Sequence, residues 1–483
     1  MKITSEFEEI PIAGVDLFRF YELAAESLGA NNVFLLESLQ GPEIDCQQSV
    51  LGIHRLAEII LTSDSVTVTG EDSVCAHINT AICSALDRNI SLHEPKDFLS
   101  ADEYWDVLRS LLTAFEEEHG HLQFGYLSSI SYDTGRLIES IPTRLPSDGP
   151  PLMVLALFQA HVVVTPEKRA FIALRHIEGV RSLDVAAVSA ILTGEVLTAE
   201  FLDCPPAAVE FTMERHRYIE AANRALEHIR AGNIYQVQLG HEIRVQTIMS
   251  PTSLYRKLRQ KNPSPYMFLA RLADVDFIGA SPESYIRLNN GTISMRPIAG
   301  TLAKTKGQAI EKQIETLIES AKENAEHIML VDLCRNDIGR VCSDKSLMVP
   351  ELMIPGEFSN LFHLISTVTG NLRSGSDVVD VLRATFPAGT MVGAPKVRAM
   401  EVIEELEGSR RGYYAGSLGI LGFGNFANMA LCIRMATRES DSTYRIRASA
   451  GIVFDSCPLA EWNETLVKMN RTYEALTGEE LTA

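Results

Sequence analysis

Segments with strand patterns and segments with helical patterns alternate along the chain between residues 210 and 478. Strands are expected at 234–239, 276–280, 285–288 and 427–434, and helices at 214–231, 309–333, 377–384 and 397–406. The alternation lacks the regular strand–helix–strand rhythm of a parallel sheet. The pattern therefore predicts an α+β fold.

An interruption of these patterns at 198–209 marks a division of the chain. Asp203-Cys204-Pro205-Pro206 breaks the periodicity immediately before the helix expected at 214–231. Before the interruption, strands are expected at 65–69, 151–158 and 161–164. We therefore expect an N-terminal regulatory or structural part at 1–200 and a second part at 210–478.

The overall charge excludes several kinds of partner. The 483 residues include 43 Lys and Arg against 63 Asp and Glu, a formal net charge of −20. This balance argues against binding to nucleic acid or to an anionic membrane surface. No basic leader followed by an apolar segment and no run of membrane-spanning length is present, so a cytoplasmic location is expected. An anionic substrate would need a local basic pocket.

The last helical segment carries a pair of carboxylates. Pro458 suits the first turn of a helix, with Asp455 and Ser456 as candidate caps. The expected buried stripe recurs at helical spacing and consists of Trp462, Leu466, Met469, Tyr473 and Leu476. On another face, the i, i+3, i+7 spacing stacks two carboxylates and an ammonium group, those of Glu461, Glu464 and Lys468.

A second carboxylate pair has the same spacing. Glu323 and Glu326 lie at i and i+3 of the helix expected at 309–333. Four carboxylates from two helices could enclose Mg²⁺, a hard cation that prefers oxygen ligands. On spacing alone, two solvated helix faces are the alternative.

One motif suggests a nucleotide site but predicts a turn. The segment 422–427 fits G-x-G-x-x-A, yet the residues that follow it suit a strand and not the helix that a dinucleotide-binding turn requires. We therefore expect a hairpin turn here.

Several ordered motifs resemble those of anthranilate synthase component I and its relatives, the aminodeoxychorismate, aminodeoxyisochorismate, isochorismate and salicylate synthases. They include Ile234-Tyr235-Gln236-Val237, Ser281-Pro282-Glu283, Arg296-Pro297-Ile298-Ala299-Gly300-Thr301, Pro387-Ala388-Gly389-Thr390-Met391 and Ala450-Gly451-Ile452-Val453. The resemblance is dense over 210–478 and implies a chorismate-binding catalytic part there. It also implies a sandwich of large, mostly antiparallel sheets with helices outside.

The resemblance assigns roles to individual residues. Glu326 and Glu464 would bind Mg²⁺, with Glu323 and Glu461 beside them, and the metal would clamp the ring carboxylate of chorismate. The pocket for the substrate would be lined by Ala299, Thr301, Tyr414, Arg434, Ser449, Ala450, Gly451 and Lys468.

The same resemblance predicts the catalytic groups. Glu283 would be the general acid that protonates the departing C4 hydroxyl, so burial should raise its pKa. His363 and Thr390 would lie beside the ring, and His363 would serve the later loss of pyruvate. Gln236 occupies a position where relatives that add water usually carry a lysine base, which favours amination at C2. Ala299 occupies the position of a nucleophilic lysine in aminodeoxychorismate synthases, which disfavours covalent catalysis.

Partners and control follow from the resemblance as well. No Gly-x-Cys-x-Gly nucleophile turn is present, so a separate glutamine amidotransferase subunit is expected to supply ammonia in a hetero-oligomer. A tryptophan feedback site would be formed by Leu36, Glu37, Ser38, Pro265, Tyr266 and Met267, although Gln47-Gln48-Ser49 replaces the Arg-Tyr-Ser motif common in relatives.

These features predict a Mg²⁺-dependent anthranilate synthase large subunit that converts chorismate and ammonia to anthranilate and pyruvate. Two alternatives stay open: a 2-amino-2-deoxyisochorismate synthase of a secondary pathway, and an aminodeoxychorismate synthase component I. Ser449 stands where relatives usually have the first glycine of Gly-Ala-Gly, and Gly240 stands where they usually have serine. The serine suggests an altered carboxylate pocket, and both departures are compatible with a specialised variant of secondary metabolism.

Overall fold

The computed structural model describes most of the chain. The described residues are 1–11, 15–46, 48–87, 96–97, 100–117, 125–145, 149–181, 183–192, 206, 208–303, 310–357, 361–439 and 442–482. Its helices are α1 (Leu17–Leu28), α2 (Asp72–Leu86), α3 (Ala101–Thr113), α4 (Val185–Leu192), α5 (Arg215–Arg230), α6 (Pro251–Lys261), α7 (Ile310–Ile318), α8 (Ala321–Gly339), α9 (Val378–Thr385), α10 (Lys396–Leu406) and α11 (Pro458–Thr477). Short 3₁₀ turns are η1 (Ala30–Asn32), η2 (Tyr132–Leu137) and η3 (Gly389–Met391).

The strands come from the whole length of the described chain. Before residue 200 they are β1 (Lys2–Ile10), β2 (Val33–Glu37), β3 (Ser49–Leu61), β4 (Ser65–Gly70), β5 (Lys96–Asp97), β6 (Glu116–Glu117), β7 (Gly125–Ile130), β8 (Met153–Val164) and β9 (Ala170–Ile177). After it they are β10 (Ala208–Phe211), β11 (Gln236–Gln246), β12 (Tyr266–Leu272), β13 (Val275–Ser281), β14 (Ser284–Asn289), β15 (Thr292–Met295), β16 (Ile298–Ala303), β17 (Met348–Glu357), β18 (Leu361–Asn371), β19 (Gly393–Ala394), β20 (Ser417–Gly422), β21 (Phe426–Leu431), β22 (Met435–Arg438) and β23 (Thr443–Ile452).

Two antiparallel sheets meet at β8. The first sheet runs in the order β11, β23, β22, β13, β12, β2, β3, and the second in the order β7, β20, β21, β14, β15, β18, β17. Strand β8 pairs with β3 of the first sheet and with β7 of the second. An apolar cluster between the sheets unites Phe34, Phe268 and Phe277 with Leu127 and Leu418. The predicted sandwich of mostly antiparallel sheets is therefore confirmed.

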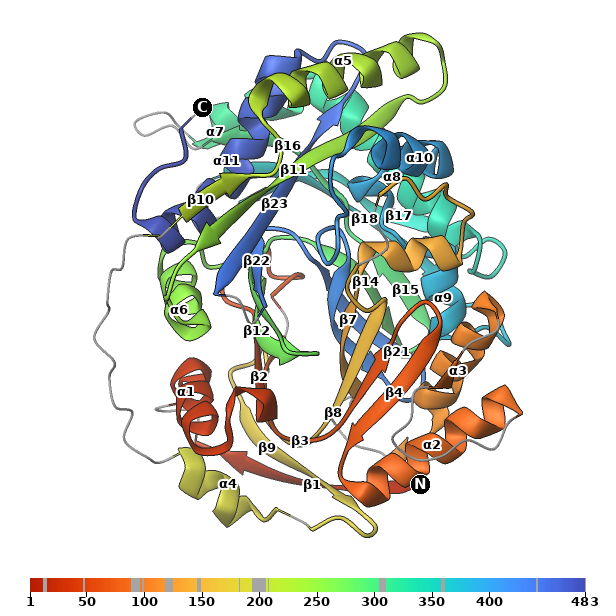
Figure 1. The fold of residues 1–483 in the computed structure, drawn as a ribbon, viewed down its shortest axis with the longest axis vertical. Coiled ribbons are helices and arrows are strands. Elements are labelled where there is room, and N and C mark those ends of the chain that lie inside the picture. Colours follow the sequence, from red (N-terminus) through yellow and green to blue (C-terminus); the bar gives the residue numbers. More distant parts are fainter. Residues whose placement is uncertain are drawn as a thin grey trace.

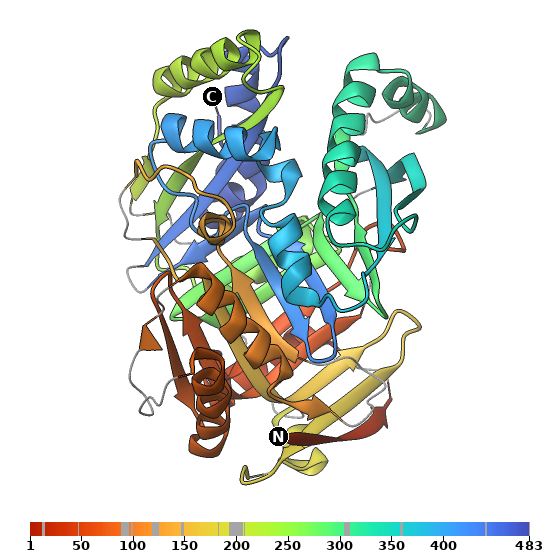
Figure 2. The same cartoon turned by 90° about the vertical axis from the view of Figure 1, so that its right-hand side faces the viewer.

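Helices cover the outside of the sheets (Figure 1). In the upper half of the molecule, α7 and α8 (teal) lie on the opposite side from α5 and α11 (yellow-green and blue) (Figure 2). Among the described helices, none combines the length and apolar character that crossing a bilayer requires.

Strands from both sides of the predicted division pair with each other. Strand β2 pairs with β12, and β7 pairs with β20, so strands from before and after residue 200 share hydrogen bonds. Of the predicted interruption at 198–209, residues 198–205 and 207 lie outside the described residues. The two-part division stays a prediction.

Several expected elements differ in detail from the structure. The helix expected at 309–333 is two helices, because Ser320 caps a new one and accepts from the N–H of Glu323 at 3.3 Å. The strands expected at 151–158 and 161–164 are the single strand β8. Cys457 and not Asp455 or Ser456 is the N-cap of α11, since the Ser456 hydroxyl accepts from the N–H of Val453 instead.

Other expectations are confirmed. The buried stripe of α11 is as predicted, and the G-x-G-x-x-A segment forms the turn between β20 and β21. At this turn Gly424 and Asn425 have φ values of 74° and 62°, the left-handed region that such hairpin turns use.

Gly52 tests the packing between β2 and β3. A Cβ at Gly52 would lie 1.9 Å from Cε1 of Phe34. We expect Gly52→Ala to cost about 1–3 kcal/mol through overpacking, seen as a lower Tm. The control Gly339→Ala, whose Cβ would lie 3.8 Å from the Leu347 side chain, should not lower the Tm. Gly52→Ala combined with Phe34→Leu should recover much of the loss. An unchanged Tm in Gly52→Ala would contradict this packing.

Candidate active site

Two connections between the sheets lie side by side and carry charged residues. The link from β13 in the first sheet to β14 in the second carries Glu283, and the link from β21 in the second to β22 in the first carries Arg434. The N–H of Leu431 donates to the carbonyl of Glu283 at 3.0 Å, and the N–H of Ala280 donates to the carbonyl of Arg434 at 3.1 Å. The paired crossings therefore hold a carboxyl group and a guanidinium group at one place in the fold.

The carboxyl group of Glu283 is almost fully enclosed, with 8% of the residue exposed. Burial raises its pKa to about 8. The Thr390 hydroxyl and the charges of Lys468 and Arg434 pull the pKa down, and the Asp45 carboxylate pushes it up, but burial is the largest influence. A carboxyl group with this pKa keeps its proton at neutral pH. Glu283 can therefore act as a general acid, as predicted.

Arg434 lies beside Lys468, and both cationic side chains act on Glu283. Nη1 of Arg434 donates to the carbonyl of Lys468 at 2.7 Å, and Nζ of Lys468 lies 2.6 Å from Oε1 of Glu464. Burial lowers the pKa of Arg434, while Tyr414, Glu464 and Glu283 act in the opposite direction. The predicted residues Tyr414, Arg434 and Lys468 thus converge with Glu283. A cationic pocket of this kind suits a dianionic substrate, in a protein whose net charge is negative.

The β11–β23 pair contributes a polar face to the same region. Gly451 pairs with Gln238, and a Cβ at Gly451 would lie 2.8 Å from Nε2 of Gln236 and 3.2 Å from Nε2 of Gln238. Any side chain at position 451 would therefore displace the two amides. Ser449 and Gly451 share this face, while Ala450 between them is fully buried on the other. In the described part of the chain, Oε1 of the buried Gln236 has no hydrogen-bond partner and can accept from a ligand.

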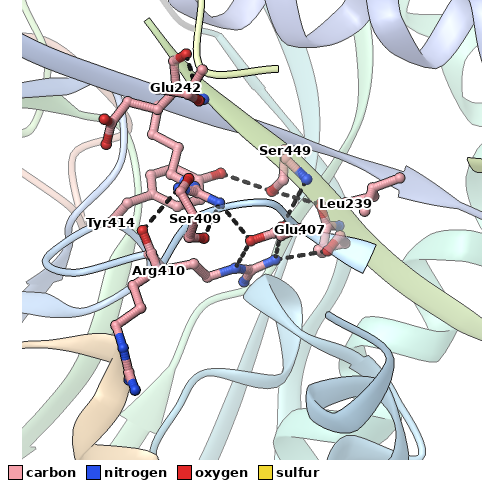
Figure 3. A network of polar contacts seen from close by, with 12 residues as sticks. Leu239, Glu242, Glu407, Ser409, Arg410, Tyr414 and Ser449 are labelled. Atoms are coloured by element: carbon pink, nitrogen blue, oxygen red, sulfur yellow. Dashed lines mark hydrogen bonds and ion pairs between the residues drawn. The ribbon is translucent and has the colours of Figure 1, made fainter. Parts of the chain in front are cut away.

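A buried ion cluster holds these strands in place (Figure 3). The Glu407 carboxylate accepts from the N–H of Gly240 at 2.8 Å, from Nη2 of Arg411 at 2.8 Å and from Nη2 of Arg447 at 2.6 Å. Burial alone would raise the pKa of Glu407, but the two guanidinium groups outweigh it and hold the pKa below its ordinary value. Nη1 of Arg411 also donates to the carbonyl of Met391 at 2.7 Å. The cluster thus connects β11 and β23 to the turn that carries Thr390.

The four predicted metal ligands are not assembled into one group. Glu461 is buried on α11, Glu464 is paired with Lys468 on the same helix, and Glu323 and Glu326 are half-buried on α8. Within the residues that the structure describes, no three His, Cys, Asp or Glu side chains come close enough to hold a metal. The donor set consists of carboxylates and so fits Mg²⁺ chemically. The magnesium site stays a prediction.

His363 lies half-buried in the middle of β18, with its backbone paired to Thr301 of β16 and Gly356 of β17. The flanking side chains of Phe362 and Leu364 pack with Leu317 of α7. Because successive side chains of a strand alternate, His363 points away from α7. Ala299 is half-buried in β16 and pairs with Leu364, and the side chain of Thr301 lies outside the described residues. The catalytic role of His363 stays a prediction.

The two segments of the predicted inhibitor site lie together. Strands β2 and β12 pair with Met267 opposite Glu37. The Glu37 carboxylate accepts from the Tyr255 hydroxyl at 2.7 Å and from Nε of Arg259 at 2.9 Å, so its charge is already engaged within the protein. Gln47 lies outside the described residues. The segments meet as predicted, and tryptophan binding stays a prediction.

Sequence analysis missed several residues that shape the site. Gln238 follows Gln236 by two positions on one strand, so the period of two could have placed both on one face. Glu407 and Arg411 have i, i+4 spacing, which is more often a solvated pair. Asp45, which is buried and lies 3.0 Å from Nε of Arg296, has no comparable signal in the sequence.

Comparisons with known proteins agree with this geometry. The family model described as chorismate binding enzyme matches residues 65–474. The chain belongs to the chorismate-binding enzyme family. It is thus an enzyme that uses chorismate, and the resemblance found in the sequence is confirmed.

Individual relatives of this chorismate-using enzyme differ in how much of it they match. A 2-amino-4-deoxychorismate synthase from Streptomyces globisporus is 39% identical over 472 residues, which cover 95% of this chain and 94% of the relative. An anthranilate synthase component 1 from Aquifex aeolicus is 45% identical over 267 residues, 55% of this chain and 53% of the relative. The solved structure of anthranilate synthase component I from Streptococcus pneumoniae superposes with a TM-score of 0.72 at 29% identity, covering 88% of this chain and 92% of that one.

Glu407→Gln tests the ion cluster. Removing this charge leaves two buried guanidinium groups without their shared partner, which should cost about 3–5 kcal/mol and lower the Tm markedly. The control Glu401→Gln removes a carboxylate paired with Arg398, in which 30% of the Glu401 side chain is exposed. That change should cost about 0–1 kcal/mol. Equal Tm values for the two variants would contradict the role of the cluster.

Glu283→Gln tests the protonated carboxyl group. The folded protein holds a proton on Glu283 that the unfolded chain releases above about pH 4.5, so wild-type stability should fall as pH rises from about 4.5 to about 8. The glutamine variant lacks this loss, and its Tm advantage over wild type should grow across that window. Chorismate turnover should drop by about 10²- to 10⁴-fold. A Tm difference that does not depend on pH would show that Glu283 is ionised at neutral pH.

Proposed function

We propose that this enzyme adds ammonia to C2 of chorismate and releases 2-amino-4-deoxychorismate and water, with the enolpyruvyl group retained. The observation that carries the proposal is the burial of the Glu283 carboxyl group beside Arg434 and Lys468, which raises its pKa to about 8. In this reaction a C2–N bond forms, both ring double bonds shift (C1=C2 to C6=C1 and C5=C6 to C4=C5) and the C4–O bond breaks. The departing oxygen takes the proton of Glu283, and the nitrogen gives up one proton.

Glu283 supplies what the leaving group needs. Hydroxide is a poor leaving group, whereas a hydroxyl that receives a proton departs as water. A carboxyl group with a pKa of about 8 is protonated at pH 7 and can give up that proton in the transition state. The neighbouring Lys468 and Arg434 stabilise the carboxylate that results.

Binding of the substrate rests on the cationic pocket. Arg434 and Lys468 would bind one carboxylate, and the N–H groups near Gly451 would add neutral donors. Glu326 and Glu464, with Glu323 and Glu461 beside them, would hold a Mg²⁺ ion that neutralises the ring carboxylate when bound.

Gln236 supports amination over hydration. Its amide is neutral and cannot act as the base that water requires, whereas ammonia is already a nucleophile. Its buried Oε1 can accept a hydrogen bond from the N–H of incoming ammonia. Ala299 cannot form the covalent amine link of a lysine, which disfavours the aminodeoxychorismate synthase that uses one.

The retained enolpyruvyl group distinguishes this proposal from anthranilate synthase, the function that the sequence first suggested. The name of the Streptomyces globisporus relative describes a chorismate with an amine at C2 and no oxygen at C4, chemically the aminodeoxyisochorismate of the alternative prediction. This relative matches 95% of the chain, whereas the Aquifex aeolicus anthranilate synthase matches 55%. Full-length similarity therefore favours the arrested reaction.

Anthranilate synthase remains the second candidate because His363 is present. A half-buried imidazole could take the C2 proton during loss of pyruvate. Ammonia would come from a separate glutaminase subunit in either case.

Product analysis tests the proposal. We expect the pure chain, given chorismate, Mg²⁺ and ammonium at alkaline pH, to form a product with the mass of 2-amino-4-deoxychorismate and little fluorescent anthranilate or pyruvate. Glutamine should replace ammonium only when a glutaminase partner is added. Stoichiometric anthranilate and pyruvate would establish the second candidate instead.

A further inference from the structure

Ser449 occupies a position where only one of two paired strands can carry a side chain. It lies in β23 opposite Gly240 of β11. A Cβ added to Gly240 would lie 3.0 Å from Cβ of Ser449 and 2.5 Å from the carbonyl oxygen of Ala448. The carbonyl of Ala448 thus keeps position 240 without a side chain, and Ser449 lies opposite this glycine. Both residues differ from those that the resembling proteins usually carry at these positions.

The Ser449 hydroxyl engages the Tyr414 hydroxyl. Oγ of Ser449 donates to Oε1 of Gln238 at 3.1 Å and lies 2.7 Å from the Tyr414 hydroxyl (Figure 3). A serine hydroxyl has one proton, and this one is given to Gln238. Ser449 therefore accepts the proton of Tyr414. Both residues are buried, with 2% and 8% exposed.

This hydrogen bond lies in the cationic pocket. Nζ of Lys468 donates to the carbonyl of Ser449 at 2.9 Å, and Tyr414 interacts electrostatically with Arg434. In the proposed function, which this inference rests on, the same pocket binds a substrate carboxylate. The Tyr414 hydroxyl therefore donates its proton to Ser449 and not to the enolpyruvyl group of the substrate.

A hydrogen bond from the Tyr414 hydroxyl to the substrate would accelerate loss of pyruvate more than it would accelerate amination. In the loss of pyruvate the C2–H bond breaks and its proton goes to a base, a ring double bond forms, and the C3–O bond breaks. The oxygen leaves with the electron pair as the enolate of pyruvate, which then takes a proton at carbon. Negative charge thus builds on the enolpyruvyl side, where one preorganised donor is worth about 10²- to 10³-fold in rate. During amination the charge builds at C4, where Glu283 acts.

We infer that Ser449 is a specificity-determining residue that holds the Tyr414 hydroxyl away from the enolpyruvyl group. Its hydrogen bond slows loss of pyruvate selectively, and the aminated ring leaves with the enolpyruvyl group intact. Ser449 acts through Tyr414 and is a positioning residue.

Ser449→Ala is the direct test, because it frees the Tyr414 hydroxyl. With chorismate, Mg²⁺ and ammonium, the ratio of anthranilate to 2-amino-4-deoxychorismate should rise at least about tenfold. This is less than the full rate effect of about 10²- to 10³-fold of one preorganised donor. The control Ser417→Ala removes another fully buried strand hydroxyl, for which the described residues offer no hydrogen-bond partner, and should leave the ratio unchanged.

A double variant shows whether Tyr414 mediates the effect. The Tyr414→Phe variant has no phenol proton. The double variant Tyr414→Phe/Ser449→Ala should therefore have the same product ratio as Tyr414→Phe alone. Ser449→Gly provides a second variant should the alanine protein fold poorly, with the same expected change.

The outcomes separate this inference from the proposed function. If wild type makes the aminated product and both Ser449 variants keep its product ratio, the inference is wrong and the function stands. An equal shift in the Tyr414→Phe background would also overturn it, because Ser449 would not act through Tyr414. If wild type itself releases anthranilate, the proposed function fails first.

Discussion

The buried ion cluster of Glu407, Arg411 and Arg447 is the interaction on which the arrangement of the site depends. Its carboxylate accepts the N–H of Gly240 in β11, while one guanidinium group comes from β23 and the other donates to the carbonyl of Met391. Three segments distant in sequence are thus fixed to one charge. A buried charge of this kind is tolerated only when its partners satisfy it, so losing one partner costs far more than the pair contributes.

Next to the strands that the cluster holds lie the two crossings that carry Arg434 and Glu283. Arg434 has a φ of 52°, unusual for a residue with a side chain, and it lies in a crossing next to the one that buries Glu283. Because burial raises the pKa of Glu283 to about 8, the folded protein loses stability as the pH rises from about 4.5 to about 8. The large core between the two sheets offsets such costs. Burial of Glu283 thus lowers stability and, by raising the pKa of the carboxyl group, makes it an acid that can donate a proton at neutral pH.

The sequence predicted the fold class and the members of the pocket but not how the chain brings them together. Periodicity predicted the strands β4, β8, β11, β13, β14 and β21 and the buried stripe of α11, because local burial determines that signal. Most of the other strands were not predicted. Periodicity also missed the break at Ser320, where a cap outweighs helical spacing, and it missed the Glu407 cluster, because an i, i+4 pair has the same spacing whether solvated or buried. Resemblance identified Glu283, Tyr414, Arg434 and Lys468, which the structure places together. It suggested anthranilate as the product, whereas full-length similarity favours a product that keeps the enolpyruvyl group. Only the register of β11 with β23 revealed that Ser449 faces Gly240 and holds Tyr414.

The protonation state of Glu283 is the central claim, and infrared spectroscopy can observe it directly. A carboxyl C=O stretch present in wild type and absent in Glu283→Gln reports the protonated group, and its intensity can be followed with pH. The account predicts a band that is nearly full at pH 7 and titrates away with a midpoint near pH 8. A band that is already lost below pH 6 would show that Glu283 is ionised at neutral pH and would contradict its role as the acid.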